Sequence, residues 1–134
     1  MKGPRRWDCR CWAAWGAVTD VYPFKRDEHG LPNPAAGVAA RTMNGMSGGG
    51  AFDEEGNLVG VIATGVGDEH SFVSLFWPAI YTPLEPKWPP LLAGSGTSLA
   101  ALARTGFCTI RNLDDVIPFT AEDGTTMISI SADP

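Results

Sequence analysis

The residues best suited to chemistry lie in the glycine-rich segment 45–53, where Ser47 stands among glycines (Gly-Met-Ser-Gly-Gly-Gly-Ala-Phe-Asp). Glycines leave backbone N–H groups uncovered and adopt main-chain angles that other residues avoid. Acyl transfer needs a serine hydroxyl beside such groups, because the hydroxyl attacks a carbonyl carbon and the N–H groups stabilise the oxyanion. The alternative is a glycine-rich surface turn in which the serine is an ordinary small polar residue.

The residues that follow Ser47 distinguish between two kinds of serine site. In α/β-hydrolases the serine stands between a strand and a helix. Here three glycines follow, and glycine disfavours a helix by about 1 kcal/mol per residue relative to alanine. The pattern instead predicts a β-hairpin, with one strand ending at Phe52, a loop over 53–57 that places Gly56 in the left-handed region, and a strand from Leu58 to Thr64. The strand–serine–helix arrangement of the α/β-hydrolases is therefore not expected.

A serine followed by this hairpin resembles the trypsin-like (chymotrypsin-fold) serine peptidases, particularly their bacterial-type branch. That family shows Gly-x-Ser-Gly-Gly, a strand ending near Asp or Asn, a glycine turn and a returning Val-Gly-Val/Ile strand. The chain matches this pattern from Gly45 to about Gly65, and looser similarity runs from Val38 to Ile80. Within it, residues 72–80 look like the closing strand that precedes a C-terminal helical segment in the family.

The resemblance implies roles for four residues. Ser47 would be the nucleophile, and the backbone N–H groups of Gly45 and Ser47 would form the oxyanion hole. Met46 stands where many relatives carry Asp or Asn, which is tolerable because the oxyanion hole is built from main chain. Arg41 and Thr42 would lie near the pocket that selects the substrate side chain, where Arg41 suits an acidic or polar group. From the residues alone, an exposed strand charge is the favoured interpretation of Arg41.

The base that must activate Ser47 is the missing part of this site. A serine needs a base to take its proton and a third group to orient that base. In the family both precede the serine on a separate N-terminal barrel, and the forty-six residues before Ser47 are too few for one. His29 lies in a polar, turn-rich stretch and His70 lies between two strands. Both are expected to be loop residues, so neither is expected to be the base.

Two explanations of the incomplete triad remain open. The chain is either the C-terminal region of a longer serine peptidase or a shortened relative that has lost catalysis. The glycine loop favours the first, because its glycines cost conformational entropy and have little purpose without an oxyanion. We therefore expect hydrolysis of peptide bonds through Ser47 on a peptide or protein substrate, with an N-terminal barrel as partner and no activity in the isolated chain. The alternative is a catalytically inactive β-barrel module that binds peptides or protein partners.

Composition and charge argue against nucleic-acid and membrane partners. The 134 residues can bury a core, and the net charge of −5 comes from scattered charges, with no basic stripe for a nucleic acid. No apolar stretch reaches the roughly 18 residues that a membrane span needs. Lys2, Arg5 and Arg6 precede an apolar run over 11–18, but that run is short and contains glycine. A cytoplasmic location is expected, with secretion as the alternative.

The cysteines indicate neither a disulfide framework nor a metal site. Cys9 and Cys11 are too close in sequence for a structural pair, and Cys108 stands alone. A Cys-x-Cys pair could supply two thiolates, but no further Cys or His cluster completes four ligands. We expect reduced thiols, no metal and no cofactor. Asp114 and Asp115 are expected to begin a solvated helical turn.

The remaining pattern predicts a mostly β protein: an antiparallel β-barrel half of a chymotrypsin-like fold with a C-terminal helix and strand. Sixteen glycines and eleven prolines suit a turn-dense β fold. The predicted domains are a partial peptidase barrel over 1–82, a Pro/Gly-rich linker over 83–96 and a small extension over 97–134. In the extension, Thr97 or Ser98 caps a helix that Gly106 ends. The other expected strands cover 15–22, 38–42, 50–53, 71–76, 107–110 and 126–131, with a helical turn over 114–118.

Overall fold

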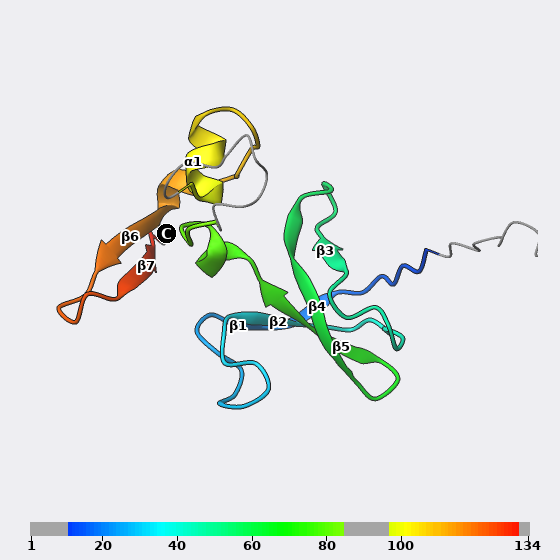
Figure 1. Cartoon of the computed structure of the whole chain (residues 1–134). Coiled ribbons are helices and arrows are strands. Elements are labelled where there is room, and N and C mark those ends of the chain that lie inside the picture. Colours follow the sequence, from blue (N-terminus) through cyan, green and yellow to red (C-terminus); the bar gives the residue numbers. More distant parts are fainter. Residues whose placement is uncertain (1–10, 85–96, 132–134) are drawn as a thin grey trace, which may run out of the picture. The chain divides into compact units, whose positions relative to one another are not determined.

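The computed structural model describes residues 11–84 and 97–131 (Figure 1). The chain divides into two compact units, Met1–Leu75 and Phe76–Pro134, which are described separately. The division falls before the segment 83–96 expected to be a linker. Residues 85–96 of that segment lie outside the described residues.

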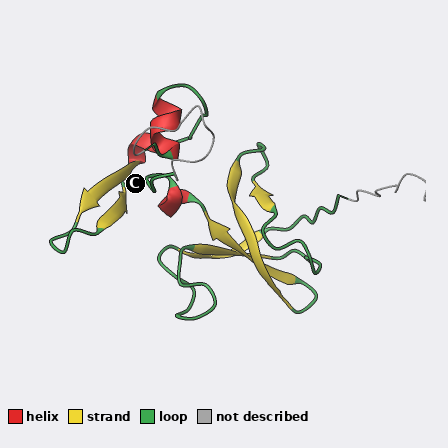
Figure 2. Cartoon of the chain, viewed as in Figure 1, coloured by secondary structure: helices red, strands yellow, loops and turns green. Residues whose placement is uncertain are grey.

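The first unit is a five-stranded sheet in which every neighbouring pair of strands is antiparallel (Figure 2). The mostly β prediction is confirmed. Across the sheet the order is β1-β2-β5-β4-β3. The strands are β1 (Val18–Tyr22), β2 (Ala35–Val38), β3 (Gly50–Phe52), β4 (Leu58–Val66) and β5 (His70–Leu75).

The sheet has a Greek-key connection. Short turns join β3, β4 and β5, whereas β2 lies beside β5 instead of beside β3. Four antiparallel strands in this relationship define a Greek key. The connection from β2 to β3, residues 39–49, must therefore pass β5 and β4 to reach the far edge of the sheet. This connection contains Ser47 and its glycines.

The β3–β4 hairpin confirms the predicted turn. The amide of Asp53 donates to the carbonyl of Asn57 at 3.0 Å, and the amide of Gly56 donates to the carbonyl of Asp53 at 3.0 Å. Gly56 has a φ of +82°, the left-handed value that favours glycine. No helix follows Ser47 before β3 begins at Gly50, as the sequence predicted.

The closed barrel that the family resemblance implies is not detected. Within the described residues the sheet is open, with β1 and β3 as its two edges. Closing a sheet requires its edge strands to pair along their length. Here β3 has only three residues and a bulge between Ala51 and Phe52, so it offers little backbone for such pairing.

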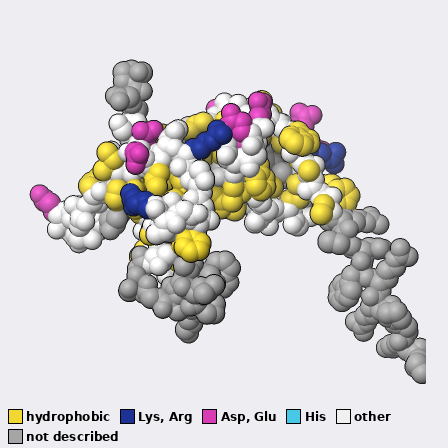
Figure 3. Space-filling model, turned by 90° about the horizontal axis from the view of Figure 1, so that it is seen from above, with side chains coloured by type: hydrophobic (Ala, Val, Ile, Leu, Met, Phe, Trp, Pro, Cys, Tyr) yellow, Lys and Arg dark blue, Asp and Glu magenta, His cyan; other side chains and the backbone are white. Residues whose placement is uncertain are grey.

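The described core of the first unit is small. Its buried hydrophobic residues are mostly alanines, and its most deeply buried polar side chain is Ser71, which is 2% exposed. Many larger apolar side chains are open to solvent instead, and Figure 3 shows several such groups on one face of the molecule. The buried hydrophobic residues are Leu31, Ala35, Ala36, Ala40 and Val73.

The second unit contains one short α-helix and a β-hairpin. The helix forms where predicted: the Ser98 hydroxyl caps it by accepting from the Ala101 amide at 3.2 Å, and Gly106 follows its end with a φ of +83°. The Tyr81 hydroxyl donates to the carbonyl of Val116 at 2.9 Å. The elements are η1 (Trp77–Ala79), α1 (Leu99–Arg104), η3 (Leu113–Asp115), β6 (Val116–Thr120) and β7 (Thr126–Ile130).

Two predictions for this unit were wrong, and one strand of the first unit was displaced. Residues 107–110 form no strand. Of the helical turn expected over 114–118, Asp114 and Asp115 lie in the helical turn η3, whereas the residues from Val116 onward form strand β6. Pro118 is tolerated in β6 because a strand of a two-stranded ribbon has one free side. The strand expected over 38–42 is β2, which ends at Val38.

No helix in residues 11–84 or 97–131 has both the length and the apolar character that crossing a membrane requires.

Candidate functional site

The glycine loop places Ser47 on an exposed turn. Gly45 and Gly48 flank the Met46–Ser47 pair with φ values of +95° and +85°. A Cβ at either glycine would meet nothing within 4 Å, so these positions require glycine for its backbone angle and not for space. Ser47 itself is exposed and lies outside any helix or strand.

Two residues of the loop are anchored on β4. The amide of Gly48 donates to the carbonyl of Ile62 at 2.7 Å, and the amide of Ile62 donates to the carbonyl of Gly49 at 2.9 Å. Within the loop, the amide of Met46 donates to the carbonyl of Met43 at 3.0 Å. The end of the loop is therefore held against the sheet by a reciprocal pair of hydrogen bonds.

The amides of Gly45 and Ser47 do not anchor the loop. Neither donates a hydrogen bond within the described part of the chain, and neither does the Ser47 hydroxyl. Exposed, unpaired amides beside a hydroxyl can receive a developing oxyanion. The four predicted site residues, Ser47, Gly45, Arg41 and Thr42, share this one connection between β2 and β3.

Thr42 takes part in a hydroxyl relay beneath the loop. Its Oγ1 lies 2.8 Å from the Ser71 Oγ, and Ser71 in turn donates to the carbonyl of Ala40 at 2.7 Å. A Cβ on Gly65 would lie 2.9 Å from the Thr42 Oγ1, so the relay packs directly against β4. Thr42 is half-buried, and the contact of its hydroxyl with Ser71 attaches the loop to β5.

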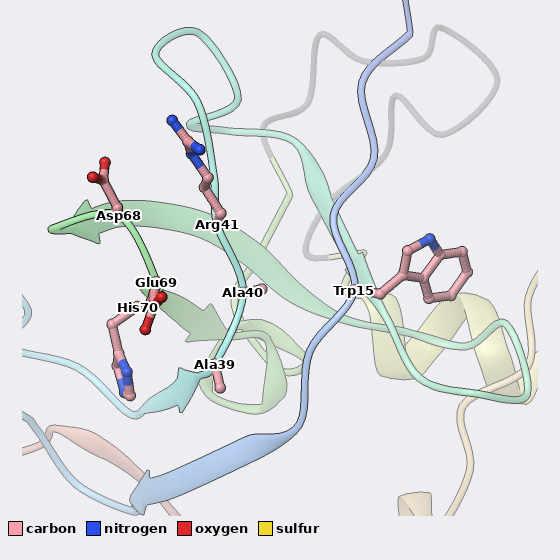
Figure 4. Close-up of a pocket in the computed structure, with 7 residues that line it drawn as sticks. All are labelled: Trp15, Ala39, Ala40, Arg41, Asp68, Glu69 and His70. Atoms are coloured by element: carbon pink, nitrogen blue, oxygen red, sulfur yellow. The ribbon is translucent and has the colours of Figure 1, made fainter.

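Arg41 borders a shallow hollow of about 630 Å³ (Figure 4). Its walls come from the segment 39–41, from Trp15, from Asp68 and Glu69 of the β4–β5 turn, and from His70 at the start of β5. Arg41 and Asp68 extend toward the same side in the close-up, but neither makes an ion pair within the described residues. The hollow is lined by one guanidinium, that of Arg41, and by the carboxylates of Asp68 and Glu69, so its lining has groups of both charges.

Neither histidine is hydrogen-bonded to Ser47. The Nε2 of His70 lies 3.0 Å from the Thr19 Oγ1 of β1, and its ring centroid lies 6.0 Å from that of Phe72. His29 belongs to the loop between β1 and β2, where its amide donates to Asp27. The expected loop position of His29 is confirmed, whereas His70 is the first residue of β5.

Asp27 organises the loop that contains His29. Its Oδ1 accepts from the amides of His29 at 3.0 Å, Gly30 at 2.5 Å and Leu31 at 3.2 Å. The Gly30 amide, the Arg26 side chain and the His29 amide hold the pKa of this carboxyl far below its ordinary value. The side chain is thus a structural acceptor, with the Arg26 Nε 2.6 Å from its Oδ2.

The described residues contain no group of three or more His, Cys, Asp or Glu side chains placed to hold a metal ion. Cys11 and Cys108 are free and exposed. Cys9 lies outside the described residues.

Comparison of the chain with sequence models of known families, with curated proteins and with solved structures found no match.

Sequence reasoning missed Ser71 as a part of this site. The available signal was its place two residues before Val73 in the strand Ser71-Phe72-Val73-Ser74-Leu75, because alternate residues of a strand share one face, and Ser71 and Val73 are both buried. A buried hydroxyl must find hydrogen-bond partners, and those nearest are the carbonyl and hydroxyl of the segment entering the glycine loop.

Proposed function

We propose that this chain is the C-terminal region of a trypsin-like serine peptidase, in which Ser47 is acylated by the carbonyl of a peptide bond. The observation that carries the proposal is an exposed serine on a left-handed glycine turn, beside the amides of Gly45 and Ser47, which donate no hydrogen bond within residues 11–84 and 97–131. The β3–β4 hairpin that follows the turn agrees with the motif on which the resemblance rests.

The chemistry divides between this chain and a partner unit. A base from the partner takes the Ser47 proton as the Oγ bonds to the carbonyl carbon. The two amides hold the resulting oxyanion, and the amine leaves with the proton that the base returns. Water then cleaves the acyl-enzyme by the same route. In this proposal the partner unit is an N-terminal barrel that carries the His and Asp of the triad.

A catalytically inactive β module that binds peptides or protein partners is the second candidate. The observation that favours it is that neither histidine is hydrogen-bonded to Ser47: His70 contacts Thr19 instead, and His29 lies in the Asp27 loop.

A fluorophosphonate probe with added imidazole separates the two candidates, because imidazole can replace an absent base. We expect mass spectrometry to find the label on Ser47, with labelling increasing with imidazole and disappearing in Ser47→Ala. Ser131, which is also exposed, serves as the internal reference for unactivated serine. Gly45→Ala, which strains the loop at a φ of +95°, is expected to reduce labelling while the far-UV circular dichroism stays unchanged. If a folded sample labels Ser47 no faster than Ser131, the binding module is supported and the peptidase proposal is rejected.

A further inference from the structure

Strand β1 is an edge with an open side. It pairs with β2 alone, and its opposite side has no strand neighbour within the described residues. Four of its five residues are exposed. The outward N–H and C=O groups of such a strand are a template for a further strand.

Large apolar side chains are exposed along this edge and its flanks. Trp15 is 89% exposed and Phe24 is 81% exposed, and within the strand Val18 and Val21 are 60% and 62% exposed. Edge strands in stable monomers are usually protected by Lys, Pro, bulges or short length. β1 contains neither Lys nor Pro. Its protective features are a bulge at its start and one charged residue, Asp20.

The opposite edge is much better protected. β3 is three residues long and carries a bulge between Ala51 and Phe52. β1 is two residues longer than β3, although it too has a bulge, between Val18 and Asp20. Among the described residues of the first unit, the buried core is largely alanine, so much of the larger apolar surface of the sheet is exposed.

We infer that β1 binds an extended segment of another polypeptide as an added strand. That segment would carry a basic side chain opposite Asp20 and apolar side chains beside Val18 and Val21. The inference goes beyond the proposed function, because it requires no reactivity of Ser47.

Charge complementarity selects this occupant. Asp20 is the one charged residue of β1, and it forms no ion pair within the described chain. A second copy paired antiparallel about the strand centre would oppose two Asp20 carboxylates, and directly opposed like charges destabilise a strand pair. Each copy would also bring a net charge of −5. A basic side chain in the partner strand instead gives an attractive cross-strand pair.

The test uses three synthetic peptides that alternate valine and threonine and differ at the central residue, which is Lys, Glu or Pro. Hydrogen exchange of the full chain is expected to show slower exchange at 18–22 with the Lys peptide. The Lys peptide should bind about fivefold more tightly than the Glu peptide, because the Glu peptide replaces an attractive cross-strand charge pair with a repulsive one. The Pro peptide, which lacks an amide donor, should bind most weakly.

Asp20→Lys should reverse the Lys-over-Glu preference. The matched control is Glu54→Lys, the same change of charge in the β3–β4 turn, which should leave the preference as it was. Ser47→Ala should bind like the wild type. Protection at 50–52 instead of 18–22, equal binding of the Lys and Glu peptides, or self-association through β1 in sedimentation experiments would each overturn the inference.

Discussion

The hydroxyl of Ser71 donates a hydrogen bond of 2.7 Å to the carbonyl of Ala40, and its oxygen lies 2.8 Å from the Oγ1 of Thr42. Ser71 belongs to β5 and is almost completely buried. This pair of contacts attaches the chain entering the glycine loop to the middle of the sheet. The position of Ser47 therefore depends on a buried hydroxyl that lies far from it in sequence.

Ser71→Ala should destabilise the first unit. The substitution leaves the Ala40 carbonyl and the Thr42 hydroxyl without their partner, and an unsatisfied buried polar group costs about 1–3 kcal/mol. Urea unfolding followed by far-UV circular dichroism measures the loss. Ser47→Ala is the matched control, since Ser47 is exposed and makes no hydrogen bond within the described residues, and its stability should change by less than about 0.5 kcal/mol. Equal stability of the two variants would show that the relay does not support the sheet.

Local signals predicted much of the sheet. Gly56 identified the β3–β4 turn because its left-handed conformation depends on nearest neighbours, and Ser98 identified the start of α1 for the same reason. The Greek-key order was not predicted, because pairing of β2 with β5 joins residues that are far apart in sequence. Residues 116–120 were misjudged because their strand depends on pairing with β7.

Gly60→Ala should destabilise the β4–β5 pair strongly. A Cβ at this position would lie 2.2 Å from the Ser74 carbonyl oxygen and 2.7 Å from the Val73 Cγ1. Backbone cannot move aside cheaply, so a cost of at least about 2 kcal/mol is expected. Thermal unfolding by circular dichroism measures it.

Gly37→Ala is the control for that substitution. Its Cβ would approach the Thr19 side-chain oxygen at 3.1 Å, a much longer contact than the 2.2 Å at Gly60, and one made with a side chain instead of with main chain. This variant should lose less than about 1 kcal/mol, because a side chain relaxes more easily than main chain. A Gly60→Ala chain as stable as Gly37→Ala would contradict the pairing of Gly60 with Leu75.

The candidate site was only partly predictable. The glycine spacing around Ser47 indicated a turn, and the left-handed angles of Gly45 and Gly48 agree with it. The partner of His70 was not predictable, because Thr19 reaches it only through the assembled order of β1, β2 and β5.

Ser98→Ala should weaken helix α1. The Ser98 hydroxyl accepts from the Ala101 amide at 3.2 Å, and loss of such a cap costs typically about 1 kcal/mol. Hydrogen exchange at Ala101 should become faster. Ser98→Asp keeps an acceptor at the cap and should retain slow exchange, so equal exchange in the Ala and Asp variants would contradict the capping role.

Asp27 should hold its loop in order at pH values where ordinary aspartates are already protonating. Amides and Arg26 lower the pKa of its carboxyl in the folded chain. A depressed folded pKa means that the carboxylate stabilises the fold fully above the unfolded aspartate pKa of about 3.9, and that this contribution disappears as the pH falls through the lower folded pKa. The chemical shifts of the His29, Gly30 and Leu31 amides should therefore stay constant from neutral pH down to about 4 and move only below it.

Asp27→Asn should speed hydrogen exchange of the same amides at neutral pH, whereas Asp68→Asn, in the β4–β5 turn, should not. A titration midpoint at or above the ordinary aspartate value would show that these hydrogen bonds do not form in solution.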